Sequence, residues 1–447
     1  MKGVIGWIKG HLLIVVSVVL IAIFLPAGFV GAGIWNGKIK AAAEETFKKQ
    51  ERDLAQQERV QYSVPAVFDG EAAIEETRAP NRRVTEFFAA EKQAREEQVT
   101  QIVERATELN RTGHELLVEG LFPEAPSERV KRDLLLEMVR RLTTDAQRLS
   151  AYDDLVRRLG AGLPPEPEEV GAILADAETK AVERRGIFQG SNEKLEPGEQ
   201  EEIREELAGQ RIGLYAGHAG DLTFYVVPGL FEPGKAGANT GQAAYSMRPG
   251  PGAQLPSEQQ AFTWQWDFWV VQDILRAVAL ANEGTAGRPV GVPDAPIKRV
   301  DSIEVGALVL GASGDDSSRR SRSGENTGPA TYTGRLGEKN SEYDVRMVSM
   351  DVIAAPAKLP MLADALSRVG FMTITDVDVT RIDPWSEIEA GYYFGSEPVA
   401  HVHLEIETVW LRSWTGPVMP ATVREALGVV LPKADTGETT EDGDEGP

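Results

Sequence analysis

An apolar run without a charged residue, from Leu12 to Trp35, constrains this chain more than any other feature of its sequence. A helix needs about 20 apolar residues to cross a bilayer, and this run is long enough. The much longer remainder of the chain is mostly polar. We therefore expect a short segment at residues 1–11, a single transmembrane anchor at residues 12–35, and a large part that works at a membrane; the side of the membrane on which residues 1–11 lie does not follow from this run.

The same segment also fits a cleavable secretory signal peptide. Lys2 and Lys9 give it a basic start, and the small residues at 30–32 could form a cleavage site. Apolar residues continue to Trp35, however, and a predicted helix follows at once, which favours an anchor that stays attached. Both interpretations export the rest of the chain.

Composition removes several classes of function. The net charge of −22 argues against a nucleic-acid partner, because proteins that bind nucleic acid carry a basic face. The absence of cysteine excludes disulfides, thiol nucleophiles and cysteine-ligated metal centres. The chain has only five histidines, which further narrows the catalytic chemistry available. We expect no cofactor and no enzymatic activity.

A helical stalk is expected at residues 36–61, where strong helix formers are common and Gly and Pro are absent after residue 37. One stripe of this helix holds Ile39, Ala43, Phe47 and Leu54, in a short heptad pattern. The stripe predicts a coiled coil with another single-span membrane protein. A solvated helix leaving the bilayer is the alternative.

A predominantly helical region is predicted at residues 81–216, after a break at residues 62–80 that contains three Pro and Gly residues. Ser127 is a suitable N-cap for one of its helices. The helix after the break has an apolar face that comprises Val99, Ile102, Val103, Ala106 and Leu109. The spacing of these residues indicates one side of an amphipathic helix.

The second half changes character and predicts strands separated by helices. A first α+β unit is expected at residues 222–310, with strands at 222–227, 262–266 and 297–310. A segment rich in Ser, Gly and Arg at residues 311–341 is predicted to be a disordered insert.

A second unit is expected at residues 342–432, with strands at 343–353, 371–382 and 399–411, followed by an acidic disordered tail at 433–447. Strand–helix–strand segments this short cover one face of a sheet, as in a ferredoxin-like sandwich. The fold class is therefore α+β: a single transmembrane helix, a helical or coiled-coil stalk, and ferredoxin-like units. Either two such units form, or one is assembled from both halves.

The search for catalytic motifs yields no complete constellation. The chain has no phosphate-binding loop of the Walker type and no dinucleotide fingerprint. His401 and His403 lie two residues apart on a predicted strand, so both imidazoles could reach one metal ion, with Glu405 extending the row. The alternative is an exposed sheet face that needs polar side chains, and we expect no metal.

Three tryptophans, Trp264, Trp266 and Trp269, form a dense aromatic cluster. Some of them are expected to face the core, yet three indoles rarely all fit inside a small domain. The cluster is therefore a candidate surface for a partner or a ligand.

The order of these parts resembles the PilO-type inner-membrane assembly proteins of type IV pili and the related GspM-type proteins of type II secretion systems. The segments YDVRMVSMDVIAAPAKLPMLADALSRVGFMTITDVDVTRI and VAHVHLEIETVWLR look like the last domain of that family, and FTWQWDFWVVQDILRAVALAN with IKRVDSIEV looks like a diverged copy. The family has no catalytic residues. The resemblance implies an amino terminus in the cytoplasm, the bulk of the chain in the periplasm, and a homo- or heterodimer at the bacterial inner membrane.

The leading hypothesis is a non-enzymatic scaffold of a pilus or secretion apparatus that acts through coiled-coil and ferredoxin-like contacts. The alternative is a membrane-anchored periplasmic ligand-binding or sensor module, with a site formed by the tryptophan cluster and a Gly- and Pro-rich loop at residues 228–256. A third hypothesis, an anchored hydrolase, would use His401 and His403.

Overall fold

The computed structural model describes residues 12–57, 60–67, 72–79, 81–144, 147–185, 195–231, 255–284, 287–306, 333, 335 and 341–430. The predicted segment at 1–11, the tail at 433–447 and nearly all of the predicted insert lie outside these residues. The chain divides into two compact units, Met1–Arg105 and Ala106–Pro447.

The first unit contains one long helix and a small hairpin. Helix α2 (Leu12–Gln57) is followed by β1 (Val60–Val64) and β2 (Ile74–Arg78), which pair antiparallel, and by most of α3 (Arg82–Arg111). The ring of Tyr62 stacks on that of Phe88 at a centroid distance of 5.0 Å. The break predicted at residues 62–80 is therefore a hairpin that packs on α3.

The described residues include no helix that is both long enough and apolar enough to cross a membrane. The anchor predicted at residues 12–35 is therefore not supported by the structure.

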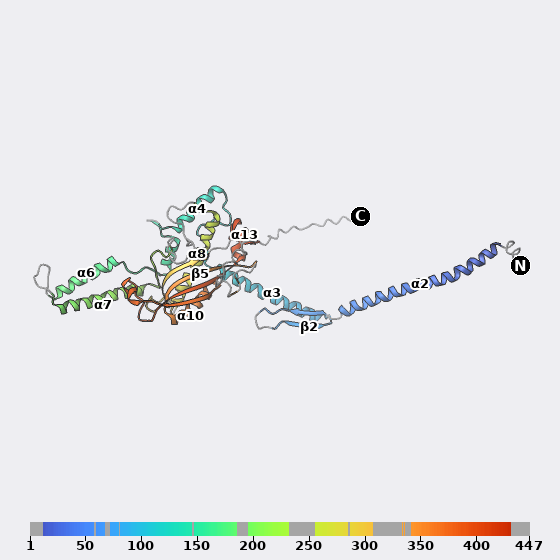
Figure 1. Cartoon of the computed structure of the whole chain (residues 1–447), viewed down its shortest axis with the longest axis horizontal. Coiled ribbons are helices and arrows are strands. Elements are labelled where there is room, and N and C mark those ends of the chain that lie inside the picture. The colour runs from blue at the N-terminus through green and yellow to red at the C-terminus, as the bar shows by residue number, and fades with distance from the viewer. Residues whose placement is uncertain are drawn as a thin grey trace, which may run out of the picture. The chain divides into compact units, whose positions relative to one another are not determined.

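The second unit begins with the last turn of α3 and four further helices, as the sequence predicts for this region. They are α4 (Glu128–Leu142), α5 (Ala151–Arg158), α6 (Pro167–Arg184) and α7 (Pro197–Asp221). The Ser127 side chain caps α4 by accepting a hydrogen bond from the backbone N–H of Val130, so the predicted cap is confirmed. Helices α6 and α7 pack side by side (Figure 1).

One mixed sheet forms the centre of the second unit. Its strands are β3 (Tyr225–Val226), β4 (Ile297–Val305), β5 (Tyr343–Ala354), β6 (Met372–Arg381) and β7 (Ala400–Leu411), in the order β3-β4-β5-β7-β6. Only the β3–β4 pair is parallel. β3 and β4, from the first predicted ferredoxin-like unit, thus belong to the same sheet as the strands of the second unit, because β4 pairs along its length with β5.

Helices cover one face of this sheet. Helix α8 (Glu258–Ala281) packs against α10 (Leu359–Val369), and the core between them and the sheet includes Val348, Met350 and Leu404. The remaining short helices are η2 (Pro356–Lys358), α11 (Pro384–Glu389), α12 (Arg412–Val418) and α13 (Ala421–Leu427).

The strand predicted at residues 262–266 is wrong, because these residues belong to α8. The side chain of Ser257 caps this helix by accepting a hydrogen bond from the N–H of Gln260. Buried residues lie on nearly every side of α8, so its sequence lacks the one-sided pattern of a surface helix. The apolar alternation over five residues therefore resembled a strand.

Candidate functional site

The stripe predicted on the stalk is exposed in this chain. Ile39, Ala43 and Phe47 lie on α2, and the Phe47 side chain is 75% exposed. The side chain of Leu54 lies outside the described part of α2. Apolar side chains spaced four residues apart on an exposed helix are available to another helix, and pairing with one stays a prediction.

The tryptophan cluster is not on the surface. Trp264, Trp266 and Trp269 are buried in α8. The indole of Trp269 donates a hydrogen bond to the carbonyl of Glu115 over 2.8 Å, and its ring stacks on that of Trp410. Their prediction as interaction residues is therefore wrong, and the ligand-binding alternative loses the tryptophan part of its site. Most of the other part, the loop at residues 228–256, lies outside the described residues.

His401 and His403 lie on the face of the sheet opposite α8, as the alternative of a polar sheet face predicts. Asp351 on β5 pairs with His403, and its Oδ1 is 2.8 Å from His403 Nδ1. The Nε2 atom of His403 is 3.3 Å from the Glu405 carboxylate. Among the described residues, no group of three or more His, Asp or Glu side chains could hold a metal ion.

The pKa of His403 is raised above its usual value. Burial alone would lower it, but the hydrogen bond and the negative charge of Asp351, together with Glu405, favour the protonated ring and prevail. This part of the sheet is therefore a charged surface in which an imidazolium is held by carboxylates.

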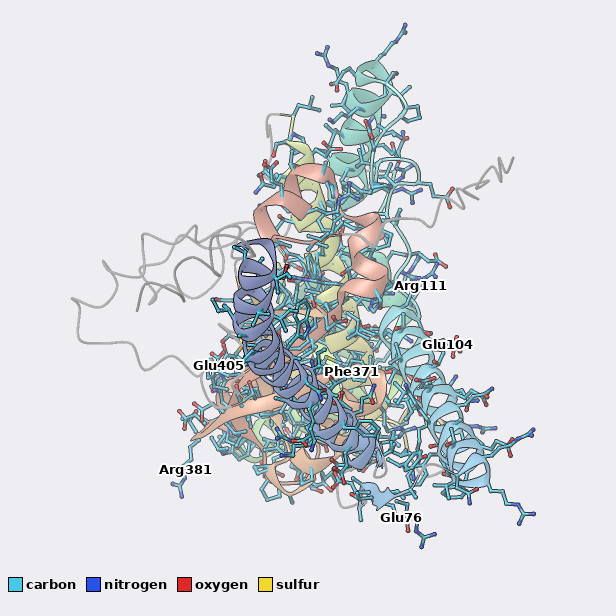
Figure 2. The ribbon with its side chains drawn as sticks, turned by 90° about the vertical axis from the view of Figure 1, so that its right-hand side faces the viewer. Glu76, Glu104, Arg111, Phe371, Arg381 and Glu405 are labelled. Carbon is cyan, nitrogen blue, oxygen red and sulfur yellow. The ribbon has the colours of Figure 1, made fainter. Side chains whose placement is uncertain are left out.

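An apolar stripe is exposed on α3, where the sequence predicted an apolar face. Val99, Ile102, Val103 and Leu109 are between 37% and 55% exposed. Their spacing places them on one side of the helix. Figure 2 shows Glu104 and Arg111 on α3 with their side chains pointing away from the ribbon. We call these four aliphatic residues the α3 stripe.

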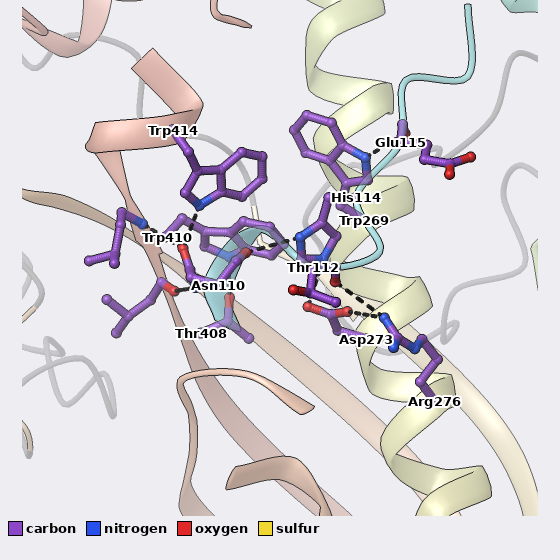
Figure 3. A network of polar contacts seen from close by, with 12 residues as sticks. Asn110, Thr112, His114, Glu115, Trp269, Asp273, Arg276, Thr408, Trp410 and Trp414 are labelled. Carbon is purple, nitrogen blue, oxygen red and sulfur yellow. Dashed lines mark hydrogen bonds and ion pairs between the residues drawn. The ribbon is translucent and has the colours of Figure 1, made fainter. Parts of the chain in front are cut away.

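The last turn of α3 is held in the second unit by Asn110, which is buried (Figure 3). Its Nδ2 donates to the carbonyl of Val409 over 2.9 Å. Its Oδ1 accepts from the N–H of Leu411 at 2.8 Å and from the indole N–H of Trp414 at 2.7 Å. One amide thus connects α3, β7 and α12.

His114 continues this network towards α8. One ring nitrogen, Nδ1, lies 3.0 Å from the carbonyl of Asn110, and Nε2 lies 2.9 Å from Asp273 Oδ2 (Figure 3). The imidazole is nearly parallel to the ring of Trp414, at a centroid distance of 5.4 Å. The lone His114 gave no signal in the sequence. Asn110 carried one, since it is a polar residue on the apolar side of an amphipathic helix.

A second buried polar group joins α8 to the sheet. Arg346 on β5 donates to Asp267 over 2.5 Å and to the carbonyl of Gly306 over 2.9 Å. Its guanidinium also lies over the ring of Trp266, 5.5 Å from the centroid. Breaking a buried ion pair on one side leaves an uncompensated charge. This pair therefore fixes α8 over β5.

Lys298 on β4 is buried as well. Its ammonium donates to the carbonyls of Val292 and Pro293 over 2.9 and 2.8 Å. Burial lowers the pKa of Lys298 to about 8, against the opposing charge of Glu397. The residue fixes the loop before β4, and its shifted pKa follows from that burial.

The outer edge of the sheet is formed by β6. In the part of the chain that the structure describes, β6 pairs with β7 alone. Val377 and Val379 are 47% and 48% exposed. A cavity of about 650 Å³ lies at the end of β6, lined by residues of β6, α11 and the connection to β7. Figure 2 shows Arg381 at the tip of this strand, with its side chain pointing away from the ribbon.

No protein-family model and no curated protein matches this chain. A crystal structure from Akkermansia muciniphila is 9% identical, covers 64% of this chain and 96% of its own, and aligns with a TM-score of 0.23. The type 4 fimbrial biogenesis protein PilO from Pseudomonas aeruginosa is 11% identical, covers 54% of this chain and 98% of its own, and aligns with a TM-score of 0.17. TM-scores of this size do not establish a common fold and assign no function.

Proposed function

We propose that this protein is a non-enzymatic scaffold that joins other proteins of a membrane apparatus by pairing of its helices. The apparatus we propose is a type IV pilus or type II secretion assembly, on the ground that the order of sequence elements resembles that family. The observation that carries the scaffold function is the α3 stripe.

The α3 stripe is a favourable surface for a second helix. Burying a large aliphatic side chain fully contributes about 1.5–3 kcal/mol, and the four side chains of the stripe are already partly covered. Completing their burial would contribute roughly 1 kcal/mol each, which is enough to favour association once a partner helix is held nearby. The exposed Ile39 and Phe47 on α2 offer a second surface of the same kind.

We further propose that the protein lies at the bacterial inner membrane with most of the chain in the periplasm. The support for this location is the uncharged run at residues 12–35 in the sequence. Extraction of host membranes with alkaline carbonate tests it, because an integral protein stays in the pellet and a peripheral one is released.

The absence of cysteine allows a direct test of helix pairing. Single cysteines replace Val99, Ile102 or Val103 on the stripe, and Gln101 or Glu104 on the other side of α3 as controls. Membranes that contain each variant are oxidised under mild conditions, and their proteins are separated by gel electrophoresis without reductant. We expect disulfide-linked adducts with a second copy or with another cysteine-bearing chain at the stripe positions only. Equal adducts at all five positions, or none at the stripe, would refute the proposal.

A further inference from the structure

The β6 edge offers an unpaired backbone to another strand. The strand is ten residues long, and its residues from Asp376 onward are exposed. Exposed edges of this length present a row of N–H and C=O groups that can pair with an added strand. Proteins use such edges to bind extended segments, with affinity from the backbone and specificity from alternate side chains.

The side chains of β6 give this edge two different faces. Val377 and Val379 pair with Leu404 and Val402 of β7, so they lie on the helix-covered face. Asp376 and Asp378 lie on the other face, where they pair with Glu405 and His403 respectively. An added strand would therefore meet an apolar row on one face and an acidic row on the other.

The cavity at the end of β6 adds a place for an apolar side chain. Val379 contributes to its wall, together with Ile388 of α11 and Phe394 of the connection to β7. A strand that continues the sheet past Val379 would carry its side chains alongside this cavity.

A second copy of the chain is a poor occupant of this edge. The antiparallel pairing that sets Val377 and Val379 of one copy opposite Val379 and Val377 of the other also sets Asp378 opposite Asp378. Like charges directly opposite each other destabilise a pair of strands. The same acids that disfavour self-pairing would favour a strand with cations at alternate positions.

We propose that β6 binds an extended segment of a different protein, in which Lys or Arg residues alternate with aliphatic residues. The basic residues would lie opposite Asp376 and Asp378, and the aliphatic residues beside Val377 and Val379. This inference rests on the proposed scaffold function and names the second kind of contact that the scaffold makes.

The test measures binding of labelled peptides to the full-length protein in mild detergent by fluorescence anisotropy. The probe is a peptide of about ten residues in which Lys and Val alternate. Its controls are a Glu–Val peptide, a peptide of the same composition with Lys and Val in two blocks, and a Lys–Val peptide with a fully N-methylated backbone. We expect the alternating Lys–Val peptide to bind at least about tenfold more tightly than each control. Equal binding of the block or the N-methylated peptide would overturn the proposal.

Charge reversal on β6 makes the test specific to the edge. The double variant Asp376→Lys/Asp378→Lys should reverse the preference in favour of the Glu–Val peptide. The matched control is Asp176→Lys/Glu178→Lys on α6, which makes the same change in net charge and should leave the preference unchanged. Equal behaviour of the two variants would reject the edge as the binding site.

Two further variants test whether a second copy of the chain occupies β6. Residues 376 and 380 lie opposite each other when the valines of two copies pair, so a disulfide between an Asp376→Cys chain and a Thr380→Cys chain would place a second copy on β6 and would also overturn the proposal. Failure of the peptide tests while cysteines on the α3 stripe still form adducts would remove the edge contact and leave the scaffold function standing.

Discussion

Replacing Asn110 with leucine should destabilise the second unit far more than the loss of one surface contact would. The substitution keeps a similar volume but removes three hydrogen bonds, leaving the Val409 carbonyl, the Leu411 N–H and the Trp414 indole N–H without their partner. Each orphaned buried group costs about 1.5 kcal/mol. Burial of the leucine methyl groups offsets about 1.5 kcal/mol. We expect the free energy of unfolding to fall by about 3 kcal/mol.

Urea unfolding of the full-length protein, followed by tryptophan fluorescence, measures this change. The control is Thr107→Ala on the same helix, which removes an exposed contact of 3.2 Å with the Ser413 hydroxyl and should cost less than about 0.5 kcal/mol. Trp414→Phe removes only one of the three donors and acceptors around Asn110 and should cost about 1 kcal/mol. A loss below about 1 kcal/mol for Asn110→Leu would refute the view that one buried amide joins three elements.

Three further predictions concern burial and protonation. Trp266→Ala should lower the free energy of unfolding by about 3–5 kcal/mol, because this side chain is buried. Trp385→Ala, at an exposed site, should change it by less than about 0.5 kcal/mol in the same urea assay. Similar effects of the two variants would contradict the assignment of the tryptophan cluster to the core. Because the pKa of Lys298 is lowered to about 8, the native state loses this proton at a lower pH than the unfolded state does. The free energy of unfolding should therefore rise by up to about 3 kcal/mol between pH 8 and pH 10, and Lys298→Met should flatten that rise. An unchanged slope in urea titrations of the variant would disprove the assignment. Because the pKa of His403 is raised, its contribution to stability is present below the ordinary histidine pKa and is lost as the pH rises through the raised value. Asp351→Asn should lower the midpoint of the NMR titration of this ring. An unchanged midpoint would count against Asp351 as the cause of the raised pKa.

The sequence predicted those elements whose burial differs between their two sides. β7 alternates between buried and partly exposed residues over most of its length, and its predicted bounds match within a residue. α8 was mistaken in part for a strand because it is buried on almost every side, so periodicity carried no information. Tertiary packing decided that case, and no local pattern could.

Local patterns also left open whether the two predicted regions form separate units or one sheet. The pairing of β4 with β5 depends on a contact across a long intervening segment, which neither strand encodes by itself. Of the predicted site residues, Ile39, Ala43 and Phe47 are exposed as a partner surface requires. The polar network could not be predicted, because Asn110, His114 and Asp273 become neighbours only when α3, α8 and β7 have packed.

The position of β7 between β5 and β6 has a consequence for the order in which the chain acquires its structure. The ribosome makes β5, α10 and β6 before it makes β7, yet β5 and β6 are joined only through β7, which pairs with both. The non-local pairings of the sheet's outer half therefore wait for residues 400–411, and non-local strand pairing is slow. A nascent chain that stops before residue 400 would carry two long strands with exposed edges, the state in which unfinished chains aggregate. Protection of this chain from aggregation would therefore matter most in the interval between the synthesis of β6 and that of β7.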